Sequence, residues 1–188
     1  MAINKVVYGG DTLIDLTSDT VEASDVMAGV SFHSADGVAR VGSYVPSVTL
    51  SACSARASDG TTVTLNQSSA KKLTINSFVT NTDVDAFELY NGGVRCKRDG
   101  IVQVSGACYI ASTGAGTMGT YIYNGSAEMT SGASYVASGN VSFTTNIAPM
   151  YVEISAGTTF YLYGRHSASK GTAHSGNKAT HLSLMYVD

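Results

Sequence analysis

The chain has 188 residues, of which 13% are charged and 44% hydrophobic, and its formal net charge is -3. With only 11 lysines and arginines the chain lacks the positive electrostatic potential that attracts a phosphate backbone, so nucleic acid is not an expected partner. It contains no apolar run of about 18 residues and begins without the apolar stretch of a signal peptide. We therefore expect no membrane insertion and no export by that route.

The composition favours an all-β protein. The chain has 20 glycines and 11 tyrosines but no tryptophan. Aromatic and β-branched residues suit pleated strands, and glycine and serine suit the turns between them. The length allows one main domain, typically about 100–150 residues, with a small extra module.

The first strand pair is predicted at the N-terminus. Residues 5–8 and 12–16 have strand character and flank Gly9 and Gly10, which predicts a hairpin. Residues 22–27 follow and predict one or two helical turns, because a glycine then ends the run.

A second hairpin is predicted a few residues later. Residues 30–33 and 38–41 flank a turn in which Asp36 and Gly37 can supply positive φ. This region has too few large side chains to bury a firm core alone. We expect it to depend on a partner surface or on neighbouring copies, and Pro46 marks where it ends, which predicts a module over 1–45 and a head domain over 46–188.

The head domain is predicted to be a succession of short strands. Its runs alternate polar and apolar residues, with turn-rich segments between them, which indicates a jelly-roll sandwich of about 8–10 antiparallel strands. The runs are 47–53, 62–65, 73–75, 86–89, 93–96, 100–110, 119–123, 141–144, 150–154, 159–163 and 181–187.

The three cysteines do not predict a disulfide framework or a metal site. Cys53, Cys96 and Cys108 are odd in number, and none stands in a Cys-x-x-Cys or Cys/His spacing. We expect them to be free and buried like small apolar residues, as in a protein assembled in a reducing bacterial cytoplasm.

No enzyme chemistry is predicted. The chain lacks a Gly-x-Ser-x-Gly motif, and its carboxylates are too scattered to nominate a glycosidase pair. We assign no catalytic residue, no cofactor and no metal ligand. Convergence of His166, His174 and His181 on a metal is an alternative to their lying in a polar exposed loop.

Two further motifs favour plain structural interpretations. Residues 81–85 offer clustered oxygens of the kind that calcium binds, but a solvated turn explains them more simply. Residues 114–119 resemble a glycine-rich phosphate loop, yet no βαβ unit surrounds them, so we expect a flexible connection between strands.

The head resembles the jelly rolls of the tumour-necrosis-factor and complement-head superfamily. The resemblance lies in the strands and turns of residues 87–106, in residues 152–162 around Ala156-Gly157, and in the closing strand 181–187. It implies a trimer in which an aromatic-rich face of each subunit packs around a threefold axis, the alternative being that these rings fill the subunit's interior. The candidates for that face are Tyr109, Tyr121, Tyr123, Tyr151, Tyr161 and Tyr163.

The N-terminal region resembles a module of tail, baseplate and fibre proteins of phages that infect Gram-positive hosts. The resemblance runs through residues 4–21 and 27–30, with His33, Gly37 and Gly42 in the expected order, and departs from the pattern at Ser43-Tyr44. It implies docking onto the phage particle. The attachment candidates are Val6, Val7, Tyr8, Leu13, Ile14, Leu16 and Phe32.

Together the two resemblances imply a trimeric structural protein of a virion, a tail or baseplate fibre or spike. Its expected partners are itself, other phage structural proteins and a host-surface glycan, which the loops 111–119, 125–140 and 164–179 would contact. Alternatives are a capsid decoration or head-fibre protein with a mechanical role and, less favoured, a polysaccharide depolymerase. The receptor-contact candidates are Tyr135, Arg165, His166 and His174.

Overall fold

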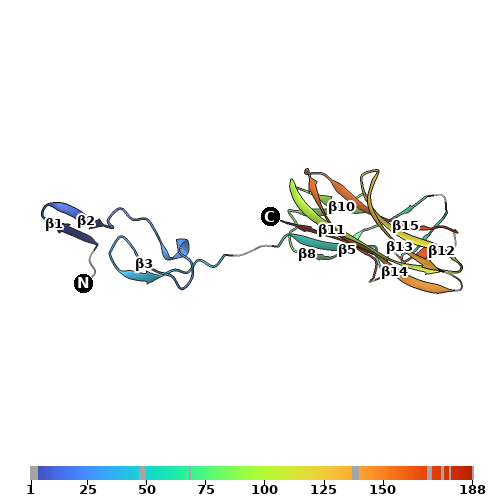
Figure 1. Ribbon diagram of the computed structural model, residues 1–188, viewed down its shortest axis with the longest axis horizontal. Helices are drawn as coiled ribbons and strands as arrows, with labels where there is room; N and C mark the ends of the chain where they lie inside the picture. The colour runs from blue at the N-terminus through green and yellow to red at the C-terminus, as the bar shows by residue number, and fades with distance from the viewer. Residues whose placement is uncertain are drawn as a thin grey trace. The chain divides into compact units, whose positions relative to one another are not determined.

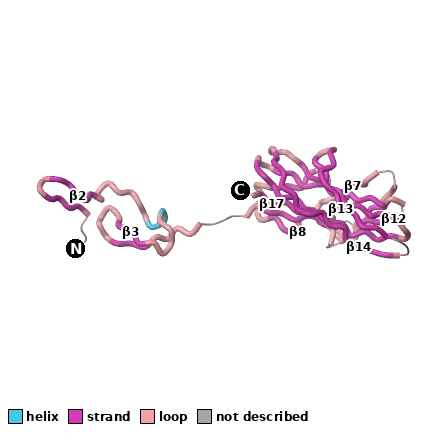
Figure 2. Tube along the Cα trace, in the orientation of Figure 1, coloured by secondary structure: helices cyan, strands magenta, loops and turns pink. Residues whose placement is uncertain are grey.

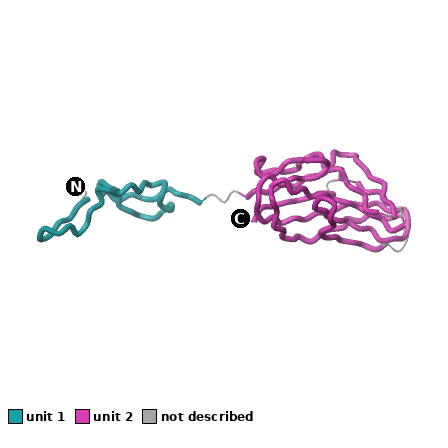
Figure 3. Tube along the Cα trace, turned by 90° about the horizontal axis from the view of Figure 1, so that it is seen from above, with its two compact units in different colours: residues 1–49 teal, residues 50–188 magenta. Residues whose placement is uncertain are grey.

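The structure is a computed structural model that describes residues 4–46, 50–67, 69–136, 140–168, 171–174, 176–177 and 179–187. The chain divides into two compact units, residues 1–49 and residues 50–188 (Figure 3). Each unit is therefore described by itself.

The first unit consists of two hairpins with a single helical turn between them (Figure 1). At the tip of the first hairpin, Gly9 and Gly10 have φ of 62° and 93°, which a two-residue turn of this kind requires. Both predicted hairpins and the helical turn are confirmed. The elements are β1 (Lys5–Tyr8), β2 (Asp11–Asp15), the 3-10 turn η1 (Ala23–Asp25), β3 (Ser31–His33) and β4 (Ala39–Val41).

This unit has almost no core. Among its described residues only Gly37 and Gly42 are buried. The unit is held instead by backbone hydrogen bonds and by polar turns, such as the one in which the Asp36 carboxylate accepts bonds from the Ser34 hydroxyl and the Arg40 guanidinium. A two-stranded hairpin without a packed face is marginal in water, in line with the small number of large side chains in this region.

The second unit is a sandwich of two antiparallel sheets, in which strands joined by loops make up most of the tube in Figure 2. This confirms the predicted jelly roll. Its strands are β5 (Ala52–Arg56), β6 (Val63–Thr64), β7 (Lys71–Leu73), β8 (Ser77–Asn81), β9 (Phe87–Tyr90), β10 (Gly93–Cys96), β11 (Gly100–Ser112), β12 (Gly116–Asn124), β13 (Ala127–Val136), β14 (Val141–Ile154), β15 (Thr159–His166), β16 (Gly171–Ala173) and β17 (His181–Tyr186).

The two sheets exchange strands in the manner of a jelly roll. One six-stranded sheet has the order β13-β12-β15-β10-β9, and β7 also pairs with β15. The other, seven-stranded sheet has the order β6-β16-β11-β17-β5-β8, and β14 pairs with β11 along its whole length. Strands adjacent in sequence, such as β12 and β11, therefore lie in opposite sheets.

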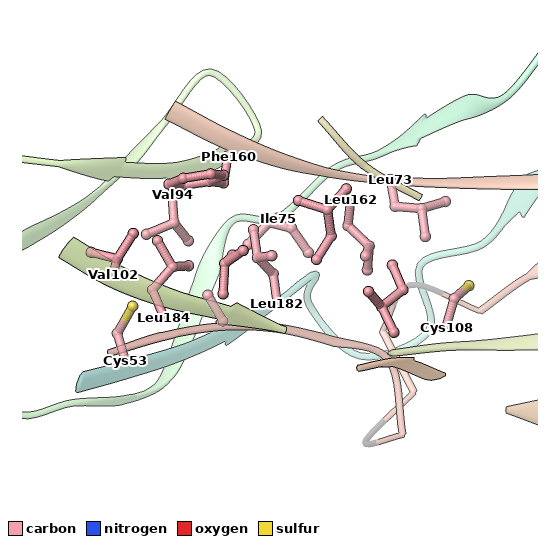
Figure 4. Packing of buried hydrophobic residues seen from close by; sticks show 14 of the residues in the cluster. Cys53, Leu73, Ile75, Val94, Val102, Cys108, Phe160, Leu162, Leu182 and Leu184 are labelled. Atoms are coloured by element: carbon pink, nitrogen blue, oxygen red, sulfur yellow. The ribbon is translucent and has the colours of Figure 1, made fainter. Parts of the chain in front are cut away.

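The core fills the space between the sheets (Figure 4). Phe160 and Leu162 enter it from β15, and they face Val102, Leu182 and Leu184 of the seven-stranded sheet. Each of these five side chains is at most 1% exposed, and burying a side chain of this size stabilises the fold by about 1.5–3 kcal/mol. Because alternate residues point to opposite faces of a strand, this core dictates which side chains each sheet presents to solvent.

Several predicted boundaries are wrong. No strand was predicted where β8 and β16 are observed, and a loop was predicted over 125–140, where the structure has β13. The predicted strands 141–144 and 150–154 are one strand, because the chain continues through a bulge opposite Ser105. The strand predicted at 47–53 is observed at Ala52–Arg56, and residues 47–49 lie outside the described part of the chain.

Candidate self-association and contact surfaces

One outward surface of the head, here called the seven-stranded face, is formed by the solvent side of the seven-stranded sheet. Its side chains alternate along each strand with the core residues. Its central members are Ile101, Gln103, Ser105 and Tyr109 from β11, Tyr151 from β14, Ser183 and Met185 from β17, and Ala52 and Ser54 from β5.

The middle of the seven-stranded face is flat because small side chains cross it in a row. Ser105 pairs with Ser183, and Ser183 pairs with Ser54, whose hydroxyl accepts a hydrogen bond from Ser183 at 3.2 Å. In the next row Gln103 is flanked by Tyr151, and its side-chain amide donates to the Tyr151 hydroxyl at 2.9 Å. Such a surface allows another flat surface to approach closely.

Apolar groups are exposed at one end of the same face. Ile101 is 47% exposed, Tyr151 64% and Val187, just after β17, 42%. The rows between Ile101 and Ser105 carry no charged side chain on β11, β17 or β5, and Glu153 opposite Ile101 lies at the edge, on β14. A flat, uncharged face with exposed apolar groups is typical of a protein–protein interface.

A second outward surface, here called the tyrosine face, lies on the six-stranded sheet. Tyr121 pairs with Tyr163, and Tyr123 pairs with Tyr161, so the four side chains form a two-by-two block across β12 and β15. The Tyr123 and Tyr163 rings lie 4.3 Å apart between centroids, tilted by 37°. All four rings are partly exposed.

The structure divides the six predicted interface tyrosines between these two surfaces. Tyr109 and Tyr151 lie on the seven-stranded face, where the Tyr109 ring packs edge-on against His174 at 5.5 Å. The other four form the tyrosine face on the opposite sheet. All six point outward, so the alternative that they fill the subunit's interior is wrong, and the six do not form one continuous face.

Two glycines of the six-stranded sheet lie close to side chains of the tyrosine face. A Cβ built on Gly93 would lie 2.6 Å from the Tyr161 ring, and one built on Gly119 would lie 2.6 Å from the Tyr121 hydroxyl. Glycine weakens a strand interior and marks places where another group approaches the backbone closely. At Gly119 the approaching group is the Tyr121 ring, whereas at Gly93 the Phe160 carbonyl, at 2.4 Å, is nearer than the Tyr161 ring.

Cations border the tyrosine face. The Lys72 ammonium lies 3.9 Å from the centroid of the Tyr161 ring, and burial lowers the pKa of Lys72. Arg165 points outward from β15 opposite Gly119, and its Nε donates to the Gln67 carbonyl. In the described part of the chain neither cation forms an ion pair.

The four predicted receptor-contact residues do not lie together. Tyr135 is 71% exposed on β13, Arg165 is half-buried on β15, and His174 packs beside Tyr109 on the other sheet. The prediction for His166 is wrong, because β15 continues to this residue and turns its ring into the core, fully buried. Its Nε2 bonds the Ser112 hydroxyl at 2.7 Å, and its Nδ1 accepts from the backbone N–H of Ala168.

The predicted contact loops are shorter than expected. Residues 125–140 are mostly β13, and 111–119 include the ends of β11 and β12, so the flexible connection predicted over 114–119 is largely strand. Residues 164–179 contain the end of β15 and all of β16. With His166 inside the sandwich and His181 pointing outward from β17, the three histidines do not converge; no His/Cys/Asp/Glu group suited to a metal was found among the described residues.

Residues 81–85 form a hydrogen-bonded turn. The Asp83 carboxylate accepts bonds from the Ser51 hydroxyl at 2.6 Å and from the backbone N–H groups of Asp85 and Ala86. These bonds, the Ser51 one foremost, lower the pKa of Asp83. This carboxylate therefore caps the turn between β8 and β9.

The attachment candidates lie on the hairpins of the first unit. Val6 and Phe32 are half-buried in β1 and β3, and Leu16, which follows β2, is half-buried too. The remaining candidates are strongly exposed: Val7 53%, Tyr8 78%, Leu13 62% and Ile14 51%.

The cysteines are as the sequence predicts. Cys53, Cys96 and Cys108 are free and buried, and burial raises the pKa of each thiol to about 12. Thiols that stay protonated at neutral pH are poor nucleophiles and poor metal ligands. They act here as packing groups. In the described chain no helix has both the length and the apolar character to span a membrane.

Comparison with solved structures identifies the fold. The head matches the crystal structure of murine APRIL at pH 5.0 with a TM-score of 0.56 and 12% identity, over 73% of this chain and 99% of that one. It matches the Eiger TNF of S. frugiperda with a TM-score of 0.54 and 12% identity, over 74% and 94% of the two chains. No family model and no curated protein sequence matches the chain.

These neighbours are jelly-roll proteins of the tumour-necrosis-factor family, so the second unit has a TNF-like jelly-roll fold. At this identity the likeness concerns the fold. The resemblance predicted from the strands and turns of residues 87–106 and 152–162 is confirmed at that level.

Proposed function

We propose that this chain is a trimeric structural protein of a phage particle, in which the first unit docks onto the virion and the head projects toward the host surface. The observation that carries the proposal is a first unit without a core, whose sequence resembles a phage attachment module, joined to a self-sufficient jelly-roll head. The protein assembles in the host cytoplasm and resides in the virion.

The first unit has the properties of a docking segment. It leaves Leu13 62% and Ile14 51% exposed on β2, and apolar groups exposed in this way suit burial against a partner. Four carboxylates outside its two ion pairs accompany these apolar groups, so we expect the partner surface to be apolar and bordered by basic residues. The four are Asp11, Asp19, Glu22 and Asp25.

The seven-stranded face supports the trimer. Its row of serines permits close contact, and Ile101, Tyr151 and Val187 remain exposed in the single chain. Three copies that pack this face around a common axis would remove these groups from water. The tyrosine face, with its cations and hydroxyls, is the more hydrated surface and stays outside.

Incorporation into particles tests the docking role. Phage particles are assembled with tagged protein. We expect deletion of residues 1–49 to leave a folded head, which has its own core, but to abolish incorporation of the protein into the particles. The double substitution Leu13→Asp and Ile14→Asp in the full chain should also abolish incorporation. The control Val84→Asp, at a side chain 71% exposed in the β8–β9 turn, should leave incorporation unchanged. Normal incorporation of the truncated head would overturn the proposal.

A further inference from the structure

The tyrosine face has features that folding alone does not explain. Four tyrosines in a two-by-two block expose aromatic surface on a sheet that already has its core on the other side. A compact exposed aromatic group of this kind marks a contact surface more often than an ordinary solvated sheet does.

The rings are laid along the sheet surface. A Cβ on Gly93 would lie 2.6 Å from the Tyr161 ring, with the Phe160 carbonyl nearer still at 2.4 Å, and a Cβ on Gly119 would lie 2.6 Å from the Tyr121 hydroxyl. Gly119 stands inside β12, where glycine is destabilising by about 0.5–1 kcal/mol relative to alanine, and Gly93 is the first residue of β10. At Gly119 the missing side chain leaves room for the Tyr121 ring close to the backbone, and the four tyrosines together present aromatic rings and hydroxyls on this sheet.

Ring faces and hydroxyls together suit a sugar. The C–H groups of a pyranose pack against an aromatic face, and phenolic hydroxyls donate to and accept from its hydroxyl groups. An apolar protein partner would instead leave the tyrosine hydroxyls and the two bordering cations without water.

The positive charges beside the tyrosine face favour sugars that carry negative charge. Lys72 and Arg165 flank the block, and Glu128, the acid beside it, is engaged by the Tyr123 hydroxyl at 3.3 Å. Ammonium and guanidinium groups recognise carboxylate, sulfate and phosphate oxygens. The face is thus complementary to an anionic saccharide.

We propose that the tyrosine face binds an acidic glycan, with the rings of Tyr121 and Tyr163 stacking on sugar and Lys72 and Arg165 binding its anionic substituents. This inference depends on the proposed attachment role in one respect only, namely that the glycan comes from a bacterial surface. It places the contact on a sheet rather than on the loops that the sequence predicted.

A glycan array tests the inference on the full chain. The probes are oligosaccharides that carry carboxylate, sulfate or phosphate groups, printed beside their neutral counterparts. We expect binding to acidic members that weakens as salt rises, and about ten-fold weaker binding, or about 1.4 kcal/mol, for Tyr121→Ser or Tyr163→Ser. Lys72→Gln reduces the preference for acidic over neutral members, and Tyr44→Ser, which removes an exposed tyrosine from the first unit, changes nothing.

Sedimentation of the same variants separates the outcomes. Absence of binding to every probe, or binding that neither tyrosine substitution weakens, would overturn the inference while leaving the trimer intact. Dissociation of the oligomer by Tyr121→Ser would show that the tyrosine face is an interface between copies, which also overturns it. Glycan binding by a monomer would instead refute the trimeric proposal and leave this inference standing.

Discussion

Substitution Ile101→Glu should dissociate the oligomer while leaving the head folded. Ile101 is 47% exposed on the seven-stranded face, so about half of its side chain remains to be buried on association. Full burial of such a side chain stabilises a protein by about 1.5–3 kcal/mol. Burial of the exposed half on association therefore contributes about 1 kcal/mol per subunit, or about 3 kcal/mol per trimer, to the free energy of association. A carboxylate at the same place adds a desolvation cost of several kcal/mol for each buried ion.

The expected shift in the trimer association constant is therefore more than about a hundred-fold. Sedimentation velocity over a concentration series measures it, and circular dichroism checks that the strand content is unchanged. Val84→Glu, a charge introduced at a side chain 71% exposed in the β8–β9 turn, is the matched control. An Ile101→Glu protein that sediments like the unmodified chain at every concentration would refute the assignment of this face.

Three further predictions concern the fold. Leu162→Ala removes a fully buried side chain from the middle of the core and should lower the free energy of unfolding of the head by about 2–5 kcal/mol in urea titration. Gly93→Ala places a Cβ 2.4 Å from the Phe160 carbonyl and should cost about 1–3 kcal/mol through that clash, whereas Gly157→Ala, with open space around it, should show only the backbone strain of its φ of +91°. Because burial raises the pKa of the three thiols from 9.0 to about 12, the stability they contribute is complete below pH 9 and is lost between pH 9 and 12; urea titrations that show no decline across this window would contradict it.

The sequence predicted the strands whose alternation is strong. Residues 93–96 and 100–110 alternate core and solvent side chains, and β10 and β11 are observed there. The turns were equally readable where glycine adopts positive φ, as at Gly9 and Gly37. In these segments local preference and tertiary structure agree.

Strands that depend on a neighbour were missed. The β13 segment contains small residues and Gly132, whose Cα lies so close to the backbone of β14 that a Cβ would approach the Asn146 carbonyl to 2.1 Å. Nothing local marks such a segment as a strand, since its pairing with β12 decides it. β16 is only three residues long and depends likewise on pairing with β11.

The surfaces were predicted only in part. The six tyrosines point outward, but alternation alone does not say to which sheet a strand belongs, so six residues of two opposite faces were grouped as one. The alternation Phe160, Leu162, Gly164, His166 along β15 was the available signal that His166 points inward. It was missed because the strand was expected to end at Tyr163.

The central claim is that three copies of this chain associate through their heads. Sedimentation equilibrium of the intact protein tests it most directly. We expect a mass three times 19.4 kDa, and a head that remains trimeric, with a correspondingly lower mass, after deletion of residues 1–49. A single species of 19.4 kDa at micromolar concentrations would contradict it.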